Sequence, residues 1–376
     1  LDEDTDNDEW SDYEEVNASI TKDPLAFDNL VQTSFHHDYN GDGLGDLLAF
    51  YPDGEFYIIA SDGENYVELG AWVTGVGDYT SIPLSADFDG DGNDDVAALN
   101  IDTGEISVAL SDTSVFSDDG IWITAFGTNS GMHLTGDFDG NGKQDILVSD
   151  ASGNWDVALS DGSEFTDDGN WLSSFANDTD SIYVADFDED GTSDLLAFYP
   201  TTGDIYVALS NGSSFDSPAK WLISFATNST YQFVGEFDGN GQIDFIAYQD
   251  SGVFEVATSL GDSFDDLGTR GNGFTSNSTQ MAAGDFDGDC LIDVVGLTVE
   301  SDPAWLASSW DVFISNGNYL VTDGSWTILT ESDFESSGCG SSVTNTFKNT
   351  PNRIKAFEEY YPLLIQNNSK RIKRIP

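Results

Sequence analysis

Short apolar runs separated by polar turns extend along most of the chain. In one unit, an apolar run from Leu195 to Tyr199 is followed by a turn at 202–204 and an alternating stretch from Ile205 to Leu209. Period-two alternation, many aromatic and β-branched residues, and turn residues roughly every 8–12 positions are typical of short β-strands. Four such segments recur in about 49 residues, so we expect an all-β protein.

A nine-residue acidic pattern, D-x-[DN]-x-[DN]-G-x-x-D, divides these strands into units. Its six copies start 49 or 50 residues apart, at 38–46, 87–95, 137–145, 186–194, 236–244 and 285–293. A unit of about 40–50 residues with four strands is typical of one blade of a β-propeller. The sequence therefore predicts a six-bladed β-propeller over residues 30–330. A seven-bladed propeller, whose last blade combines the two chain ends, is the alternative.

The acidic pattern has the chemistry of a site for a hard cation. Ca²⁺ is bound by roughly six to eight oxygen atoms, and side chains at alternate positions of a tight loop can converge on one point. We expect side-chain oxygens from positions one, three, five and nine, and a backbone carbonyl from position seven. Position six is usually glycine, which permits the positive φ of a sharp turn. The candidate ligands are Asp38, Asn40, Asp42, Leu44, Asp46, Asp87, Asp89, Asp91, Asn93, Asp95, Asp137, Asp139, Asn141, Lys143, Asp145, Asp186, Asp188, Asp190, Thr192, Asp194, Glu236, Asp238, Asn240, Gln242, Asp244, Asp285, Asp287, Asp289, Leu291 and Asp293.

Other interpretations of these loops fit less well. An EF-hand needs a glutamate at position twelve, where this chain has only Ala, Val or Gly. Nonapeptide β-rolls would repeat every nine residues, and Mg²⁺ demands a stricter octahedron. A solvated acidic turn without metal is the remaining alternative, although its crowded carboxylates would repel one another. The sixth loop has the weakest pattern because Cys290 replaces its glycine, and fewer carboxylates predict weaker binding in loops with Asn40, Asn141 or Asn240.

The loops also resemble a known family. DFDGDG at 87–92, DFDGNG at 137–142 and EFDGNG at 236–241, with the apolar strands that follow, resemble the FG-GAP/VCBS repeats of integrin α-subunit-type propellers. This resemblance covers about residues 30–330. It implies a calcium-binding propeller, with each metal in the hairpin between the first two strands of a blade. It also implies an extracellular or cell-surface location and often adhesion or ligand recognition, but no single activity.

Charge divides the chain into three parts. Lys plus Arg number 11 and Asp plus Glu number 69, for a formal net charge of −58. Seven of the cations lie in a basic tail at 347–376, and an acidic arm at 1–29 carries nine acids in its first fifteen residues. A body so poor in cations is not expected to bind nucleic acid. No apolar run reaches the roughly 18 residues of a membrane-spanning helix, so none is expected.

The segments at the two ends of the chain are interpreted separately from the propeller. Residues 331–346 read as a linker that contains Cys339, and Asn349 to Pro351 resembles a helix start, so we expect a partly helical tail. A solvated linker is one interpretation of this tail. The other is a docking element for an acidic surface, such as the acidic arm of the next copy, which would join copies into rings or filaments. The start at Leu1 favours a processed or excised chain.

Two kinds of covalent modification are expected in an oxidising secretory compartment. A disulfide between Cys290 and Cys339 would tie the segment after the last blade to the sixth loop, and two free thiols are the alternative. The N-x-[ST] pattern predicts surface N-glycosylation. Its six candidate acceptors are Asn17, Asn177, Asn211, Asn228, Asn277 and Asn367.

A tryptophan recurs near the last strand of a unit. It occurs at Trp72, Trp122, Trp171 and Trp221. We expect these indoles to form wedges between neighbouring blades. A ring of exposed indoles that stacks on sugars is the alternative, and burial decides between them.

The sequence favours a binding function over catalysis. It contains no G-x-S-x-G, H-E-x-x-H or phosphate-loop signature, so no enzymatic activity is expected. The first hypothesis is an extracellular calcium-binding propeller that acts as an adhesion or recognition module for a protein or glycan ligand, with about six structural Ca²⁺ ions. The alternatives are a structural subunit of a glycosylated extracellular assembly, joined through its ends, and a carbohydrate-binding lectin. A polysaccharide-active enzyme is a further alternative, because the 69 acidic residues make any single carboxylate pair uninformative.

Overall fold

The computed structural model describes most of residues 39–326 of the chain. The described residues are 39–40, 47–51, 53–61, 66–128, 130–179, 181–273, 278–284, 291–299 and 308–326. They form antiparallel β-sheets, and this part of the chain contains no helix and therefore no helix that could cross a membrane. The expected acidic arm, linker, basic tail and tail helix all lie outside these residues.

Six sheets follow one another along the chain, and we number them as blades one to six. Strands that neighbour in the sequence are also neighbours in each sheet, so every blade is an up-and-down meander. Blade one comprises β1 (Leu47–Tyr51), β2 (Glu55–Ser61) and β3 (Tyr66–Val73), blade two β4 (Ser81–Ala86), β5 (Asp95–Asn100), β6 (Glu105–Ser111) and β7 (Phe116–Ile123), and blade three β8 (Met132–Gly136), β9 (Asp145–Ser149), β10 (Trp155–Ser160) and β11 (Phe165–Leu172). Blade four comprises β12 (Ser181–Ala185), β13 (Asp194–Tyr199), β14 (Asp204–Ala208) and β15 (Ala219–Leu222), blade five β16 (Tyr231–Gly235), β17 (Asp244–Gln249), β18 (Val253–Ser259) and β19 (Phe264–Asn272), and blade six β20 (Ser278–Gly284), β21 (Asp293–Val299), β22 (Ser308–Ser315) and β23 (Leu320–Trp326).

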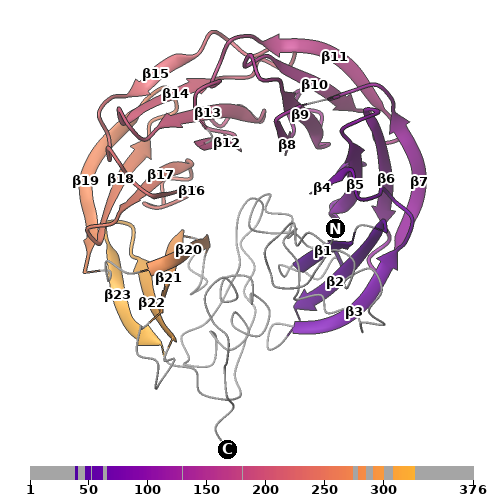
Figure 1. The fold of residues 1–376 in the computed structure, drawn as a ribbon. Helices are drawn as coiled ribbons and strands as arrows, with labels where there is room; N and C mark the ends of the chain where they lie inside the picture. Colours follow the sequence, from indigo (N-terminus) through magenta and orange to yellow (C-terminus); the bar gives the residue numbers. More distant parts are fainter. Residues whose placement is uncertain are drawn as a thin grey trace, which may run out of the picture.

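The blades stand side by side around a common axis. Strands β4, β8, β12, β16 and β20 lie innermost, and β7, β11, β15, β19 and β23 lie at the periphery (Figure 1). This arrangement confirms the all-β fold and the β-propeller expected from the repeat. A seventh blade would involve the chain ends, which lie outside the described residues, so the choice between six and seven blades stays a prediction.

The antiparallel order places the acidic loops together at one end of the propeller. In blades two to six each loop joins the first strand to the second, as between β4 and β5, and in blade one the loop precedes β1. Because the strands alternate in direction, the turn from third to fourth strand lies at the same end. We call this end the loop face. The turns from second to third strand and the connections between blades lie at the opposite face.

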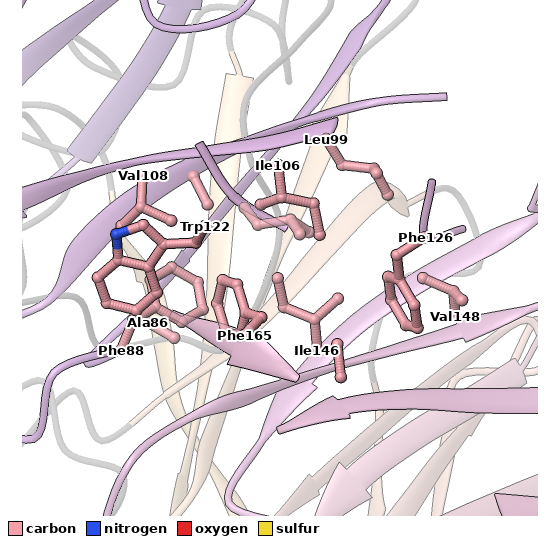
Figure 2. Close-up of a cluster of buried hydrophobic side chains, with 13 residues drawn as sticks. Ala86, Phe88, Leu99, Ile106, Val108, Trp122, Phe126, Ile146, Val148 and Phe165 are labelled. Atoms are coloured by element: carbon pink, nitrogen blue, oxygen red, sulfur yellow. The ribbon is translucent and has the colours of Figure 1, made fainter. Parts of the chain in front are cut away.

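The core lies between the blades, where tryptophans fill the interfaces. Trp122 is 5% exposed, and its ring centroid lies 5.1 Å from that of Phe165 in the next blade. Figure 2 shows both rings in the cluster that joins blades two and three, with Phe88 and Ile146 beside them. Trp72, Trp171 and Trp221 are 5–6% exposed and pack in the same way on Phe116, Phe215 and Phe264.

These contacts confirm the expected wedges and exclude the four indoles as a sugar-stacking surface. Aromatic pairs of this geometry add about 0.5–1.5 kcal/mol beyond the burial of apolar area. Blade five departs from the pattern because Gly271 stands at the tryptophan position. There a Cβ on Gly271 would lie 3.1 Å from the Cβ of Leu320, so a leucine of blade six fills the space.

Candidate metal centre

Four acidic loops bring three carboxyl groups together in the same way. In blades two to five, oxygen atoms from positions one, three and nine lie within 4.8 Å of one another. The first two carboxyl groups are half-buried and the third is buried. The four groups are Asp87, Asp89 and Asp95; Asp137, Asp139 and Asp145; Asp186, Asp188 and Asp194; and Glu236, Asp238 and Asp244.

In the loops of blades two to five, the first carboxylate is fixed by the backbone that turns around it. Asp87 Oδ1 accepts hydrogen bonds from the N–H groups of Gly90 at 2.7 Å and Asp91 at 3.1 Å, and Oδ2 accepts one from Gly92 at 2.9 Å. The backbone reaches this geometry because Gly92 has a φ of +95°, which L side chains rarely adopt. In blade five the longer Glu236 accepts equivalent bonds from Gly239 and Gly241. The turn therefore orients one ligand before any ion binds.

The carboxylate at position nine is held at the base of the loop. Asp95 is fully buried, and it accepts hydrogen bonds from the N–H groups of Phe88 at 3.0 Å and Ser111 at 2.8 Å. Asp145, Asp194 and Asp244 make the same two bonds in their own blades. The position-nine residue thus joins the loop to the third strand of its blade.

The electrostatics of this position favour a cation. Burial, with a smaller contribution from the neighbouring carboxylates Asp89 and Asp87, raises the pKa of Asp95 to about 8. The same causes raise the pKa of Asp194 to about 8 and those of Asp145 and Asp244 to about 7. A divalent ion beside the three groups would favour their ionised forms. The all-oxygen donor set fits Ca²⁺, which positions one, three and nine would hold.

The side chain at the fifth position makes hydrogen bonds within the loop, and its predicted role as a ligand stays a prediction. Asp91 Oδ1 accepts hydrogen bonds from both the N–H and the side-chain amide of Asn93, each at 2.9 Å. Asn141 Oδ1 likewise accepts a bond from the N–H of Lys143, and its Nδ2 donates to Asp139 at 3.0 Å. The structure therefore shows the fifth side chain capping the turn at the seventh residue.

The first and sixth loops lie largely outside the described residues. Asp38, Asp42, Leu44, Asp46, Asp285, Asp287, Asp289 and both cysteines are not described. In the first loop Asn40 is half-buried, and in the sixth Leu291 is half-buried. Asp293 is buried and accepts a 2.7 Å hydrogen bond from Ser315 N–H, as in the other blades. The sixth loop thus retains the position-nine bond despite its weak pattern.

The acidic pattern does not indicate two kinds of residue near the loops. It predicts only a backbone role for Lys143, yet the Lys143 side chain extends toward blade two, where a Cβ on Gly90 would lie 3.0 Å from its Cγ. Its charge opposes the rise in the pKa of Asp89. The serines bonded to position nine were missed entirely, although a serine follows that position by 15 or 16 residues in blades two to five. That fixed spacing was the available signal.

The predicted glycosylation acceptors divide between the two faces. Asn177 and Asn228 are exposed in connections between blades, and Asn211 is exposed in a turn on the loop face. The Oδ1 atom of Asn211 accepts a 2.8 Å hydrogen bond from the hydroxyl of Ser213. Asn17, Asn277 and Asn367 lie outside the described residues.

Comparisons with known proteins concern the repeat and the fold. Residues 137–197 match the model of the FG-GAP-like repeat. A structure of an Agrocybe aegerita lectin that recognises non-reducing terminal N-acetylglucosamine aligns with a TM-score of 0.62 at 18% identity, over 85% of this chain and 81% of the lectin. The fission yeast SREBP–SCAP binding domains align with a TM-score of 0.47 at 11% identity, over 84% and 80% of the two chains. No curated protein matches the sequence.

Proposed function

The chain carries FG-GAP-like repeats folded as a β-propeller, and from this premise we propose that it is a calcium-dependent recognition module that acts outside the cell. The observation that carries the proposal is the recurrence of three converging carboxyl groups in four successive blades. A single acidic turn is common on protein surfaces. The same three positions converging in each of these blades, with the third carboxyl group buried, support a shared ligand.

In this proposal the ions are structural. Each ion would neutralise part of an acidic loop and hold the first hairpin of its blade, because positions one and nine belong to the two ends of the loop. An ion that binds only the folded chain adds stability by mass action. Bound cations would also reduce the formal net charge of −58, whose self-repulsion opposes the compact state.

The proposed location follows from the affinity expected of such sites. Extracellular calcium modules typically bind with dissociation constants of about 10⁻⁴–10⁻³ M, so they need a calcium-rich medium. The exposed acceptors Asn177, Asn211 and Asn228 also suit a secreted or cell-surface glycoprotein. We propose binding rather than catalysis as the activity of this module.

Carbohydrate is the ligand class we propose to test first. The fold is shared with a lectin over most of both chains, although this similarity concerns the fold alone. The tryptophan wedges are buried, so sugar contacts would have to come from other side chains, such as the exposed rings of Tyr79 and Tyr319. A glycan array probed in calcium and in chelator would test this class. Binding to one group of terminal sugars supports it, and an array without signal in calcium opposes it.

The calcium proposal has a direct test on the full chain. Isothermal titration with Ca²⁺ should show several bound ions, and excess chelator should lower the melting temperature. Asp87→Asn removes one converging carboxylate and should reduce the number of ions by one. Asp102→Asn is the matched control, because this exposed residue lies in a turn at the opposite face and undergoes the same charge change. A melting temperature that is unaffected by chelator would contradict the structural role.

A further inference from the structure

In blades two to six, a buried serine at or just past the end of the third strand links the blade to the acidic loop of the preceding blade. Ser160 Oγ, on β10 of blade three, donates a 2.6 Å hydrogen bond to the backbone carbonyl of Phe88, in the loop of blade two. Ser160 is 2% exposed and Phe88 is fully buried, so water does not compete for this bond. The equivalent bonds run from Ser111 to Tyr39, Ser210 to Phe138, Ser259 to Phe187 and Ser315 to Phe237, at 2.6–3.2 Å.

The same serine is also bonded to the acidic loop of its own blade. The N–H of Ser160 donates to Asp145 Oδ1 at 2.8 Å, while its hydroxyl donates to Phe88. The N–H of Phe88 in turn donates to Asp95, the position-nine residue of the preceding loop. A continuous chain of buried hydrogen bonds therefore runs from Asp145 through Ser160 and Phe88 to Asp95, and on to Ser111.

A second contact connects the same pairs of loops at the ligand residue itself. The N–H of Gln144, at position eight of the third loop, donates a 2.9 Å hydrogen bond to the carbonyl of Asp87, at position one of the second. Ser193 and Ile292 make the same bond to Asp137 and Glu236, at 2.7 and 2.6 Å. Each of these first-position ligands is therefore fixed partly by the loop of the next blade.

We propose that the five buried serines are positioning residues that couple each acidic loop to the preceding one, so that cations bind cooperatively around the ring. The cooperativity rests on the proposed calcium function, whereas the coupling of the loops does not. An ion that orders one loop fixes its position-nine aspartate, which fixes the serine, which holds the carbonyl of the preceding loop. The next ion then binds a loop that is already partly ordered, so its binding loses less conformational entropy. This difference is the physical basis of positive cooperativity.

The geometry gives the coupling a direction that can be tested without metal. Ser160 belongs to blade three but holds the loop of blade two, so Ser160→Ala should loosen residues 87–93 more than residues 186–192 of blade four. The variant also removes a 3.1 Å bond that Ser160 Oγ accepts from the N–H of Gly162 in its own blade. Loss of the buried bond to Phe88 should speed amide exchange by roughly two- to tenfold in residues 87–93. Hydrogen exchange of the full chain in chelator, resolved by peptide mass spectrometry, measures both segments.

A matched variant separates this effect from general destabilisation. Ser149 is also buried, at 6% exposure, and ends the neighbouring strand β9 outside the relay of hydrogen bonds. Ser149→Ala should therefore change exchange in residues 87–93 no more than in residues 186–192. Either of two results for Ser160→Ala, measured relative to the unmodified chain, would overturn the proposed coupling. One is exchange that speeds equally in both segments, and the other is exchange that speeds more in residues 186–192 than in residues 87–93.

Calcium titration then tests the cooperativity. The unmodified chain should give a Hill coefficient above one, and the double variant with Ser160→Ala and Ser210→Ala should bring it toward one with the same number of bound ions. A Hill coefficient of one in the unmodified chain would overturn the cooperative step. Absence of any calcium binding would overturn the calcium function and the cooperativity with it, while the exchange experiment would still decide whether the loops are coupled.

Discussion

The indole N–H of Trp122 donates a 2.9 Å hydrogen bond to Asp119 Oδ2, three residues earlier on the same outer strand. The ring thus keeps its polar atom satisfied within blade two while its apolar surface packs on Phe165 of blade three. Trp171 repeats the arrangement with Asp168 and Phe215. Each wedge is therefore fixed in orientation by its own strand and buried by the next blade.

Removal of one wedge should destabilise the propeller strongly. Trp122→Ala leaves a cavity between two blades and should lower the free energy of unfolding by about 3–5 kcal/mol. Ile121→Ala is the control on the adjacent residue, which is 54% exposed and should change stability by less than about 0.5 kcal/mol. Urea denaturation measures both variants. Equal stability of the two would show that the interface between the blades is not stabilised by the indole.

Stability in chelator should fall as the pH rises. The folded pKa values of Asp95 and Asp194, about 8, and of Asp145 and Asp244, about 7, lie above the usual 3.8. The folded chain therefore holds protons that the unfolded chain has released, so this contribution to stability is complete below about pH 4 and is lost as the pH rises through 7 to 8. We expect the melting temperature in chelator to fall by several degrees between pH 6 and pH 8.

Calcium supplies the control for this pH dependence. A bound ion favours the ionised carboxylates, so the decline between pH 6 and pH 8 should be much smaller in millimolar Ca²⁺ than in chelator. Exposed carboxylates are already ionised at pH 6 and contribute little to the change. The same decline with and without calcium would show that the ion does not contact these four residues.

Replacement of the glycine at position six by any residue with a side chain should lower the stability of the fold. Gly92→Ala forces an L residue to a φ of +95°, and no atom lies within 4 Å of the added Cβ, so the expected loss of about 1–2 kcal/mol reflects backbone strain alone. Gly131→Ala is the control, because Gly131 has no positive φ and the nearest atom to its added Cβ, Ser149 O, lies at 3.9 Å. Thermal unfolding measures the difference. A Gly92→Ala variant as stable as Gly131→Ala would contradict the strained turn.

Secretion from a eukaryotic cell should attach glycans to the exposed acceptors. Asn177, Asn211 and Asn228 are all exposed, so folding hides none of them from an added sugar. Intact-mass measurement before and after enzymatic deglycosylation should show a loss, and replacement of each asparagine with glutamine should remove one glycan at a time. A mass that matches the bare polypeptide would contradict this prediction.

The local features of the fold were predictable from the sequence. Strand alternation and the spacing of the acidic pattern indicate blades, because each blade repeats the same short-range pattern of turns and strands. The convergence of Asp87, Asp89 and Asp95 was also predicted, since all three lie within one nine-residue loop. At the fifth position Asp91 accepts a hydrogen bond from the N–H of Asn93, and its predicted role as a ligand stays a prediction.

Contacts between blades were decided only by the tertiary structure. The sequence predicts wedges for the tryptophans, with exposed rings as the alternative, and the packing of Trp122 on Phe165 of the next blade confirms the wedges. The serine relay joins residues 72 positions apart, as in Ser160 and Phe88, and no local pattern reports such a pairing. The repeating blade and its acidic loop thus follow from the sequence, since both depend on residues that are neighbours in the chain. Packing of blade against blade decided which side chains are buried and which loops are linked.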